Sequence, residues 1–200
     1  MKSVAIIGAG PAGLVAAKTL IHSYPGSFNV KIFEQSTHVG GLWAVESNPQ
    51  SMINPEMSTN LSQFTVCFSD LAWDSLKLQT PPNPHPKAWQ VNRYLVEYAK
   101  RYIPVDTMVL GVRVVGVEES KAIDQNGSQQ WKITTAGVAN GLEKVEIFDY
   151  LVVASRFFSG PRSPPFSCSD INLRSDKCKK APIMMHSSQY RHLSDLFPGD

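Results

Sequence analysis

A glycine-rich turn near the N-terminus constrains the fold of this chain more than any other sequence feature. Ser3 to Ile7 is a short apolar run typical of a buried strand, and it leads directly into Gly8-Ala9-Gly10-Pro11-Ala12-Gly13. Apolar residues then recur at helical spacing until Tyr24-Pro25-Gly26, where proline and glycine end a helix. A second strand is expected from Val30 to Glu34. This N-terminal stretch therefore predicts a compact β-α-β unit.

The glycines of this turn have separate physical roles in a β-α-β unit. The first permits the tight turn, the second lets the backbone approach a diphosphate, and the third lets the helix pack closely on the strand. The start of the helix presents free amide groups and the positive end of its dipole to the phosphates. A dinucleotide site is therefore expected at Gly8, Gly10, Pro11, Ala12 and Gly13.

Glu34, at the end of the second predicted strand, supplies a carboxylate opposite the glycine turn. The acidic residue of a dinucleotide site accepts hydrogen bonds from the ribose hydroxyls. A carboxylate here would repel a 2′-phosphate, so NADP is disfavoured in this site. FAD and NAD remain as candidate ligands.

Residues 44–87 predict a long irregular connection on the surface, because asparagine, serine and proline are scattered through them. One or two helical turns are expected within it. The next segment has apolar residues at helical spacing, namely Val91, Leu95, Tyr98 and Tyr102. This spacing predicts a helix, which Pro104 would end.

Three β-rich runs follow this helix, at 108–117, 131–135 and 144–154. Turn residues between them predict a small antiparallel β-meander over 107–148, and the last run is apolar enough to return to the buried parallel sheet. The fold class is therefore α/β: a Rossmann-like β-α-β unit with a parallel sheet, plus the meander. We expect a dinucleotide-binding domain over 1–155 and a loop-rich tail, abundant in proline and serine, over 156–200.

Composition narrows the classes of partner. The chain has 19 Lys and Arg against 17 Asp and Glu, without a basic cluster that would attract nucleic acid or an anionic membrane. Its three cysteines lack the spacing of a metal site or a disulfide framework, which favours a reducing compartment. The N-terminal apolar run fits a strand and a turn better than a signal peptide, and a span of roughly 20 apolar residues is absent from the sequence. We expect a cytoplasmic protein with a small-molecule substrate, no metal, and neither nucleic acid nor membrane as partner.

A second glycine pair follows Glu34, in the sequence His38-Val39-Gly40-Gly41-Leu42-Trp43. With it the chain resembles the flavin-containing monooxygenase family, within the flavoproteins that bind two dinucleotides. The resemblance implies that the first glycine turn binds the diphosphate of FAD and that Glu34 binds its ribose. It also implies that Gly41, Leu42 and Trp43 run along the cofactor. NAD dehydrogenases are not expected to carry this second pair, so the resemblance favours FAD over NAD.

The family resemblance continues in the irregular segment, where Thr59-Asn60 precedes Phe68-Ser69-Asp70. It implies that Thr59 and Asn60 contact FAD and that Asn60 is catalytic, lying over the flavin ring, where a buried amide can donate a hydrogen bond to the reacting oxygen and exclude water. The other interpretation of Asn60 is that it caps a turn. For Val114, the resemblance implies a backbone contact with adenine, and the other interpretation is a residue of the sheet core.

Two positions depart from the family pattern. Arg156 stands where family members have a glycine that allows close approach of the cofactor, so its side chain is expected to affect FAD affinity. His186 belongs to a fingerprint of the family that is only partly kept here. It is interpreted either as a catalytic base or, with no partner visible in the sequence, as a structural residue.

The function implied by the resemblance is that of an FAD-dependent monooxygenase. Such an enzyme uses NADPH and O2 to oxygenate a small molecule, and a substrate from secondary metabolism is one expectation. A second G-x-G-x-x-G motif for NADPH is absent from these 200 residues, so the chain is expected to be truncated. The alternative is a non-catalytic FAD- or nucleotide-binding remnant or interaction module. An NAD-linked dehydrogenase is a third hypothesis, for which we find no His or Lys placed for hydride transfer.

Overall fold

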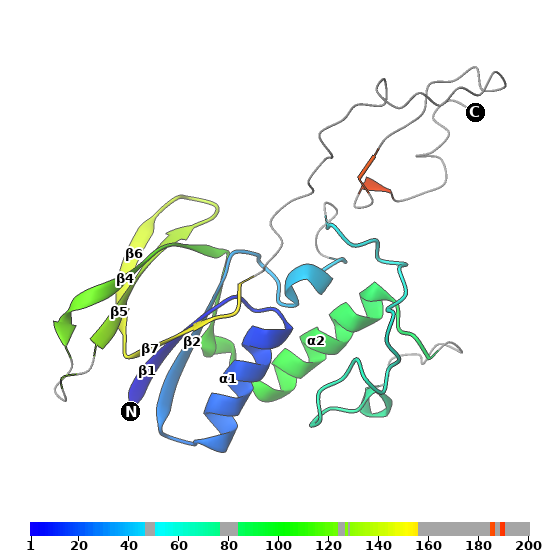
Figure 1. Cartoon of the computed structure of the whole chain (residues 1–200), viewed down its shortest axis with the longest axis horizontal. Coiled ribbons are helices and arrows are strands. Elements are labelled where there is room, and N and C mark those ends of the chain that lie inside the picture. The colour runs from blue at the N-terminus through cyan, green and yellow to red at the C-terminus, as the bar shows by residue number, and fades with distance from the viewer. Residues whose placement is uncertain are drawn as a thin grey trace, which may run out of the picture.

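Two β-sheets and two long helices organise the part of the chain that the computed structural model describes, namely residues 1–46, 51–76, 84–123, 127, 129–155, 185–186 and 189–190 (Figure 1). The N-terminal half contains β1 (Lys2–Ile7), α1 (Pro11–Ser23), β2 (Phe28–Glu34), the short 3-10 turns η1 (Gly41–Trp43) and η2 (Trp73–Ser75), and α2 (Ala88–Tyr102). The remainder contains η3 (Val105–Thr107), β3 (Met108–Leu110), β4 (Val112–Ile123), β5 (Gln129–Gly137), β6 (Glu143–Phe148) and β7 (Tyr150–Val153).

The parallel sheet has the strand order β3-β2-β1-β7, and every neighbouring pair in it runs parallel. Val4 in β1 stands between Val30 of β2 and Tyr150 of β7. A parallel pair needs a crossover, and α1 supplies it between β1 and β2. The predicted β-α-β unit is confirmed, and so is the return of the last strand to this sheet.

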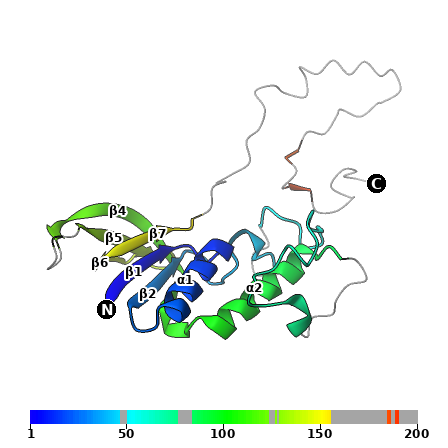
Figure 2. The ribbon, with the colours of Figure 1, turned by 60° about the horizontal axis from the view of Figure 1, so that its bottom comes forward.

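Successive residues of the parallel strands face opposite layers, because side chains alternate along a strand. Val4, Ile6 and Ile32 pack with α1 and α2 in one core, whereas Ala5 and Phe33 pack with the meander in a second core. Figures 1 and 2 show the helices on one side of the sheet and strands β4, β5 and β6 on the other. This arrangement leaves the carboxyl ends of β1 and β2 free to carry a site.

The antiparallel meander has the order β4-β5-β6, as predicted, but two of the predicted runs are divided. The run 108–117 breaks at Gly111, whose φ of +69° turns the chain between the two sheets. The Gly111 amide donates to Ser36 O at 2.9 Å. Of the two halves of this run, β3 therefore joins the parallel sheet and β4 joins the meander. The run 144–154 is also divided, at Asp149 between β6 and β7, but without a residue of positive φ.

Helix α2 confirms the predicted helical face, and Pro104 follows its end. Three tyrosines spaced four residues apart on α2 hold the irregular segment at residues 68–71. Tyr94 accepts a hydrogen bond from the Phe68 amide and donates one to Leu71 O, both at 2.7 Å. The hydroxyls of Tyr98 and Tyr102 donate to Asp70, at its side chain and its carbonyl, respectively.

Burial and a salt bridge complete this cluster. Burial raises the pKa of Tyr94 to about 12, and it raises the pKa of Tyr98 as well. Lys18 on α1 forms an ion pair with Asp70 at 2.8 Å, and this contact lowers the pKa of Asp70. The segment that lacks regular structure is thus fixed to both helices by side chains. Within its described residues, η2 is a single helical turn, as expected from the sequence.

Candidate functional site

The β1–α1 turn is built by glycines at positions where a side chain would clash. Gly8 has φ +104°, and a Cβ there would stand 2.7 Å from Ala154 O, at the end of β7. A Cβ on Gly13 would stand 1.9 Å from Gly8 O. The Gly8 amide donates to Phe33 O at 2.8 Å, which ties the turn to β2. These contacts correspond to the tight-turn and close-packing roles predicted for the first and third glycines.

Helix α1 begins without a side-chain cap. Gly10 is the N-cap residue, in extended conformation, with no side-chain hydrogen bond and no acidic residue in the first turn. Pro11 occupies the first helical position, where its missing N–H costs nothing. The amides of Ala12 and Gly13 therefore stand at the positive end of the helix, and the first turn of α1 carries no acidic side chain that would pair with them. This is the environment that suits a phosphate.

The Glu34 side chain reaches back to the glycine turn. Its Oε2 accepts a hydrogen bond from the Ala9 amide and its Oε1 accepts one from the Ser36 amide, both at 2.8 Å. The residue is only 8% exposed. Each carboxylate oxygen can accept a second hydrogen bond, so the group retains capacity for a ribose hydroxyl. Glu34 thus lies beside the turn, as the sequence predicts.

The second glycine pair lies against the first glycine turn. The Gly40 amide donates to Ala9 O at 2.9 Å, and a Cβ on Gly41 would stand 3.0 Å from the Cα of Gly10. Both Gly40 and Gly41 have positive φ, at +113° and +58°. η1 starts here, and within the described chain no backbone carbonyl accepts a hydrogen bond from the amides of Gly41 and Leu42. Backbone from two separate segments therefore lines one wall beside the start of α1.

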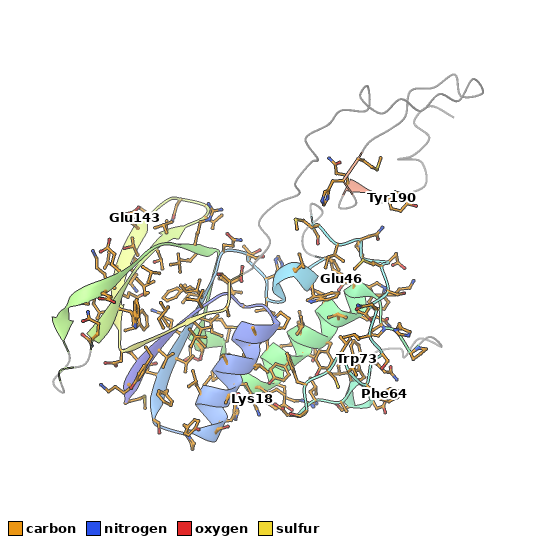
Figure 3. The ribbon with its side chains drawn as sticks, in the orientation of Figure 1. Lys18, Glu46, Phe64, Trp73, Glu143 and Tyr190 are labelled. Carbon is orange, nitrogen blue, oxygen red and sulfur yellow. The ribbon has the colours of Figure 1, made fainter. Side chains whose placement is uncertain are left out.

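Helix α2 supports this second turn through residues that sequence reasoning missed. Arg93 forms a two-point ion pair with Glu46, with Nη2 at 2.9 Å and Nε at 3.2 Å from the carboxylate oxygens, and it stacks on Trp89 with 4.8 Å between Cζ and the ring centroid. Figure 3 shows Glu46 between the end of η1 and α2. Asn92 packs against Gly40. Asn92 follows the buried Ala88 by four residues, on a helix face that is otherwise apolar. A polar residue at such a position is the signal that could have identified it.

Thr59 is fixed near the start of α2, and within the described part of the chain no hydrogen bond joins Thr59 or Asn60 to the glycine turn. The Thr59 amide donates to Pro86 O at 2.9 Å, and its hydroxyl donates to Leu61 O at 2.6 Å. Thr59 is buried and Asn60 is exposed. The hydroxyl bond closes a local turn, the amide bond joins Thr59 to the chain just before α2, and Asn60 lies exposed on the irregular segment. Its proposed catalytic role stays a prediction.

Three further predicted positions are Val114, His186 and Arg156. Val114 lies in β4 opposite Thr135 and packs on the core shared with Phe33, so the sheet-core interpretation describes its side chain, and a backbone contact with adenine stays a prediction. His186 closes a local turn, in which the Gln189 amide donates to its carbonyl at 2.8 Å. Arg156 lies outside the described residues.

The described residues carry two further findings about partners. None of the helices in the described ranges combines the length and the apolar character needed to cross a membrane. Across the same part of the chain, His, Cys, Asp and Glu side chains do not gather in threes around a potential metal position. The cytoplasmic location stays a prediction.

The wall around the start of α1 has several features that suit a dinucleotide diphosphate. Within the described chain it combines an uncapped helix end, two η1 amides without a backbone acceptor, closely packed glycines, and a carboxylate hydrogen-bonded to the turn. The model for flavin-binding monooxygenase-like proteins matches residues 1–199. The chain belongs to this family. The resemblance noted from the glycine pairs and the Asn60 segment is therefore confirmed at the level of the family.

Relatives within the family agree with this assignment. Dimethylaniline monooxygenase [N-oxide-forming] 2 of Pan troglodytes is 30% identical over 99% of this chain and 34% of its own length. Flavin-containing monooxygenase FMO GS-OX-like 1 of Arabidopsis thaliana is 30% identical over 80% of this chain and 36% of its own length. The chain thus spans about a third of the length of these curated relatives.

Solved structures share the fold. The S-allyl-L-cysteine S-oxygenase from Allium sativum superposes with a TM-score of 0.71 at 24% identity, over 95% of this chain and 42% of that protein. A steroid monooxygenase bound to NADP superposes with a TM-score of 0.59 at 22% identity, over 84% of this chain and 28% of that one. These likenesses confirm the predicted α/β fold of a flavin monooxygenase.

Proposed function

We propose that this chain binds FAD at the β1–α1 turn and contributes that site to an NADPH- and O2-dependent monooxygenase. One observation carries the proposal: the Glu34 carboxylate, the uncapped start of α1 and the Gly40–Gly41 turn all lie against the same β1–α1 turn. Family membership supports it, since the family is described as flavin-binding. When bound, FAD would supply the redox and oxygen-activating chemistry.

The residues of the chain would hold the cofactor by its two polar parts. Amides of Ala12, Gly13 and Leu42 would donate to the diphosphate, and the dipole of α1 would offset its charge. Glu34 would accept hydrogen bonds from the ribose hydroxyls. Because its carboxylate already accepts from the Ala9 and Ser36 amides, its orientation is set before the ligand arrives. We propose contacts to FAD for Gly8, Gly10, Pro11, Gly41, Trp43, Thr59 and Val114 as well.

Asn60 is the residue that we propose as catalytic. Its side chain would donate a hydrogen bond at the reacting oxygen and help to exclude water from it. The support is the family match, which extends through the Thr59-Asn60 segment. Asn60 is exposed in the ligand-free chain, so the bound cofactor would have to cover its side chain. The local turn that fixes Thr59 would hold Asn60 in place. The substrate class that we propose is a small molecule with a nucleophilic nitrogen or sulfur or a carbonyl group, including natural products, and the N-oxide-forming relative supports the nitrogen case.

Isothermal titration of the 200-residue chain with FAD, NAD and NADP tests the binding proposal. We expect saturable binding of FAD, weaker binding of NAD, and no binding of NADP, because Glu34 would repel the 2′-phosphate. A visible absorbance spectrum of the protein after gel filtration gives an independent reading. A chain that remains colourless and gives no heat with FAD would refute the proposal. Oxygen uptake with NADPH and a thioether or tertiary amine then tests turnover separately from binding.

A further inference from the structure

Asn92 on α2 presents a buried side-chain oxygen that lacks a hydrogen-bond partner. The residue is 4% exposed, and no donor in the described part of the chain reaches its Oδ1. It lies against the second glycine turn, where a Cβ on Gly40 would stand 3.3 Å from this oxygen. Buried polar atoms are almost always hydrogen-bonded, because removing them from water without a partner is costly. The amide of Asn92 therefore needs an explanation.

The described part of the ligand-free fold gives the oxygen of this side chain no hydrogen-bond donor. Asn92 gives the Gly40–Gly41 turn a packing contact but no hydrogen bond, and the tether between α2 and this segment is the Arg93–Glu46 pair. Its helical neighbours Val91 and Leu95 are buried and apolar. A leucine of similar volume would fill the same space without the unpaired oxygen. The polar group is thus a cost to the ligand-free chain that a ligand could offset.

The position of this oxygen relates it to the proposed FAD site. Gly40 lies beside the Asn92 oxygen, and the Gly40 amide donates a hydrogen bond to Ala9 O in the first glycine turn. The adjacent Gly41 packs on Gly10. Asn92 thus stands one backbone layer behind the wall that would face the cofactor. The backbone at this point is that of Gly40 and Gly41, which carry no side chains between the oxygen and the glycine turn.

We propose that Asn92 is a further FAD-binding residue whose side-chain oxygen accepts a hydrogen bond from a hydroxyl group of the cofactor. FAD carries several sugar-type hydroxyls, which act as donors and need acceptors once they leave water. In this assignment the turn shifts on binding, and the unpaired atom of the ligand-free chain gains its partner in the complex. The inference rests on the proposed function, because it requires that FAD binds.

The substitution Asn92→Leu tests this inference, since it removes the acceptor and retains the volume. The dissociation constant for FAD, measured by isothermal titration of the whole chain, should rise about fivefold, the effect of one neutral hydrogen bond. The thermal midpoint of the ligand-free variant should stay unchanged or rise, because a buried unpaired oxygen has been removed. Weaker binding together with an equally stable or more stable ligand-free protein is the expected pattern.

Tyr98→Phe is the matched control. It removes a polar atom from the same helix, one that is bonded to Asp70 and not to the glycine turn, so FAD affinity should stay within about twofold of the original chain. Asn92→Ala is the second variant, for use if the leucine packs badly, and it should weaken FAD binding to the same degree.

The outcomes separate the two proposals. If the original chain binds FAD and both Asn92 variants bind it equally well, Asn92 is not a binding residue, while the proposed function stands. If the variants lose affinity only in step with a lowered thermal midpoint, Asn92 has a structural role and the inference is wrong. If the original chain itself does not bind FAD, the proposed function fails, and this inference fails with it.

Discussion

Gly13 lies so close to Gly8 that a Cβ on Gly13 would stand 1.9 Å from the Gly8 carbonyl oxygen. Helix α1 therefore meets the end of β1 at backbone contact distance. The change Gly13→Ala has to push the helix away from the sheet, and we expect it to lower the free energy of unfolding by about 2–3 kcal/mol. Urea unfolding followed by circular dichroism measures this loss.

The control for this change is Gly26→Ala, in the turn after α1. Gly26 also has positive φ, at +75°, but a Cβ there meets no atom within 4 Å. Only the conformational penalty applies, so we expect a loss of about 1 kcal/mol. Equal losses for the two variants would contradict a packing role for Gly13.

Gly10→Ala separates binding from stability. A Cβ at Gly10 would stand 3.7 Å from Gly41 Cα, an ordinary contact, and its φ of −77° suits any residue. We expect the free energy of unfolding to change by less than about 0.5 kcal/mol. The added methyl group would stand where a diphosphate approaches the backbone, so the dissociation constant for FAD should rise at least about tenfold in isothermal titration. A stable variant that binds FAD as tightly as the original chain would count against the site assignment.

Glu34→Gln tests the carboxylate at the glycine turn. In the original chain each of the Ala9 and Ser36 amides donates to its own carboxylate oxygen of Glu34. Glutamine has a single acceptor oxygen for the two amides. We expect a loss of about 1–2 kcal/mol in the free energy of unfolding and about tenfold weaker FAD binding. The exposed Glu143, on β6, gives the control Glu143→Gln, which should change neither quantity (Figure 3). An unchanged FAD affinity in the Glu34 variant would contradict its ribose role.

The parts of the fold that depend on local sequence were predictable. The β1–α1–β2 unit follows from apolar runs and glycines that are close in sequence, and Glu34 follows from its position at the end of the second strand. The division at Gly111 was not predicted, because a glycine inside a β-rich run does not reveal which sheet each half joins. The contacts of Tyr94 with Phe68 and of Arg93 with Glu46 join residues 26 and 47 positions apart. Such pairings depend on how α2 packs against the rest of the fold, and the residue pattern of a single sequence does not reveal that packing.

Tyr94→Phe tests how strongly α2 holds the irregular segment. The Tyr94 hydroxyl serves both the Phe68 amide and Leu71 O, so its removal leaves a donor and an acceptor without their partner. We expect a loss of about 1–3 kcal/mol in the free energy of unfolding. Tyr98→Phe, which removes a single longer bond of 3.2 Å to Asp70, should cost about 1 kcal/mol or less. A larger loss for Tyr98→Phe than for Tyr94→Phe would reverse this ranking of the two contacts.

Asp149 makes stability depend on pH in the acid range. The Ser3 backbone amide donates to its Oδ2 at 2.7 Å and, with the Ser3 hydroxyl, lowers the pKa of Asp149 from its ordinary value of 3.8 to about 2. A group whose pKa is lower in the folded state stabilises the fold above its unfolded pKa, and this contribution is lost as the pH falls through the folded value. We therefore expect the contribution of Asp149, about 1–2 kcal/mol, to be present at pH 5 and to disappear between about pH 4 and pH 2.

Urea unfolding of the original chain and of Asp149→Asn over pH 2–5 measures this contribution as a difference. The two curves should converge as the pH falls, because the asparagine cannot ionise and its stability lacks this pH-dependent part. The exposed Asp106 gives the control Asp106→Asn, whose curve should run parallel to that of the original chain. If the Asp149→Asn curve also runs parallel throughout, the hydrogen bonds from Ser3 do not stabilise the ionised carboxylate, and the link between the start of β1 and the β6–β7 turn is not electrostatic.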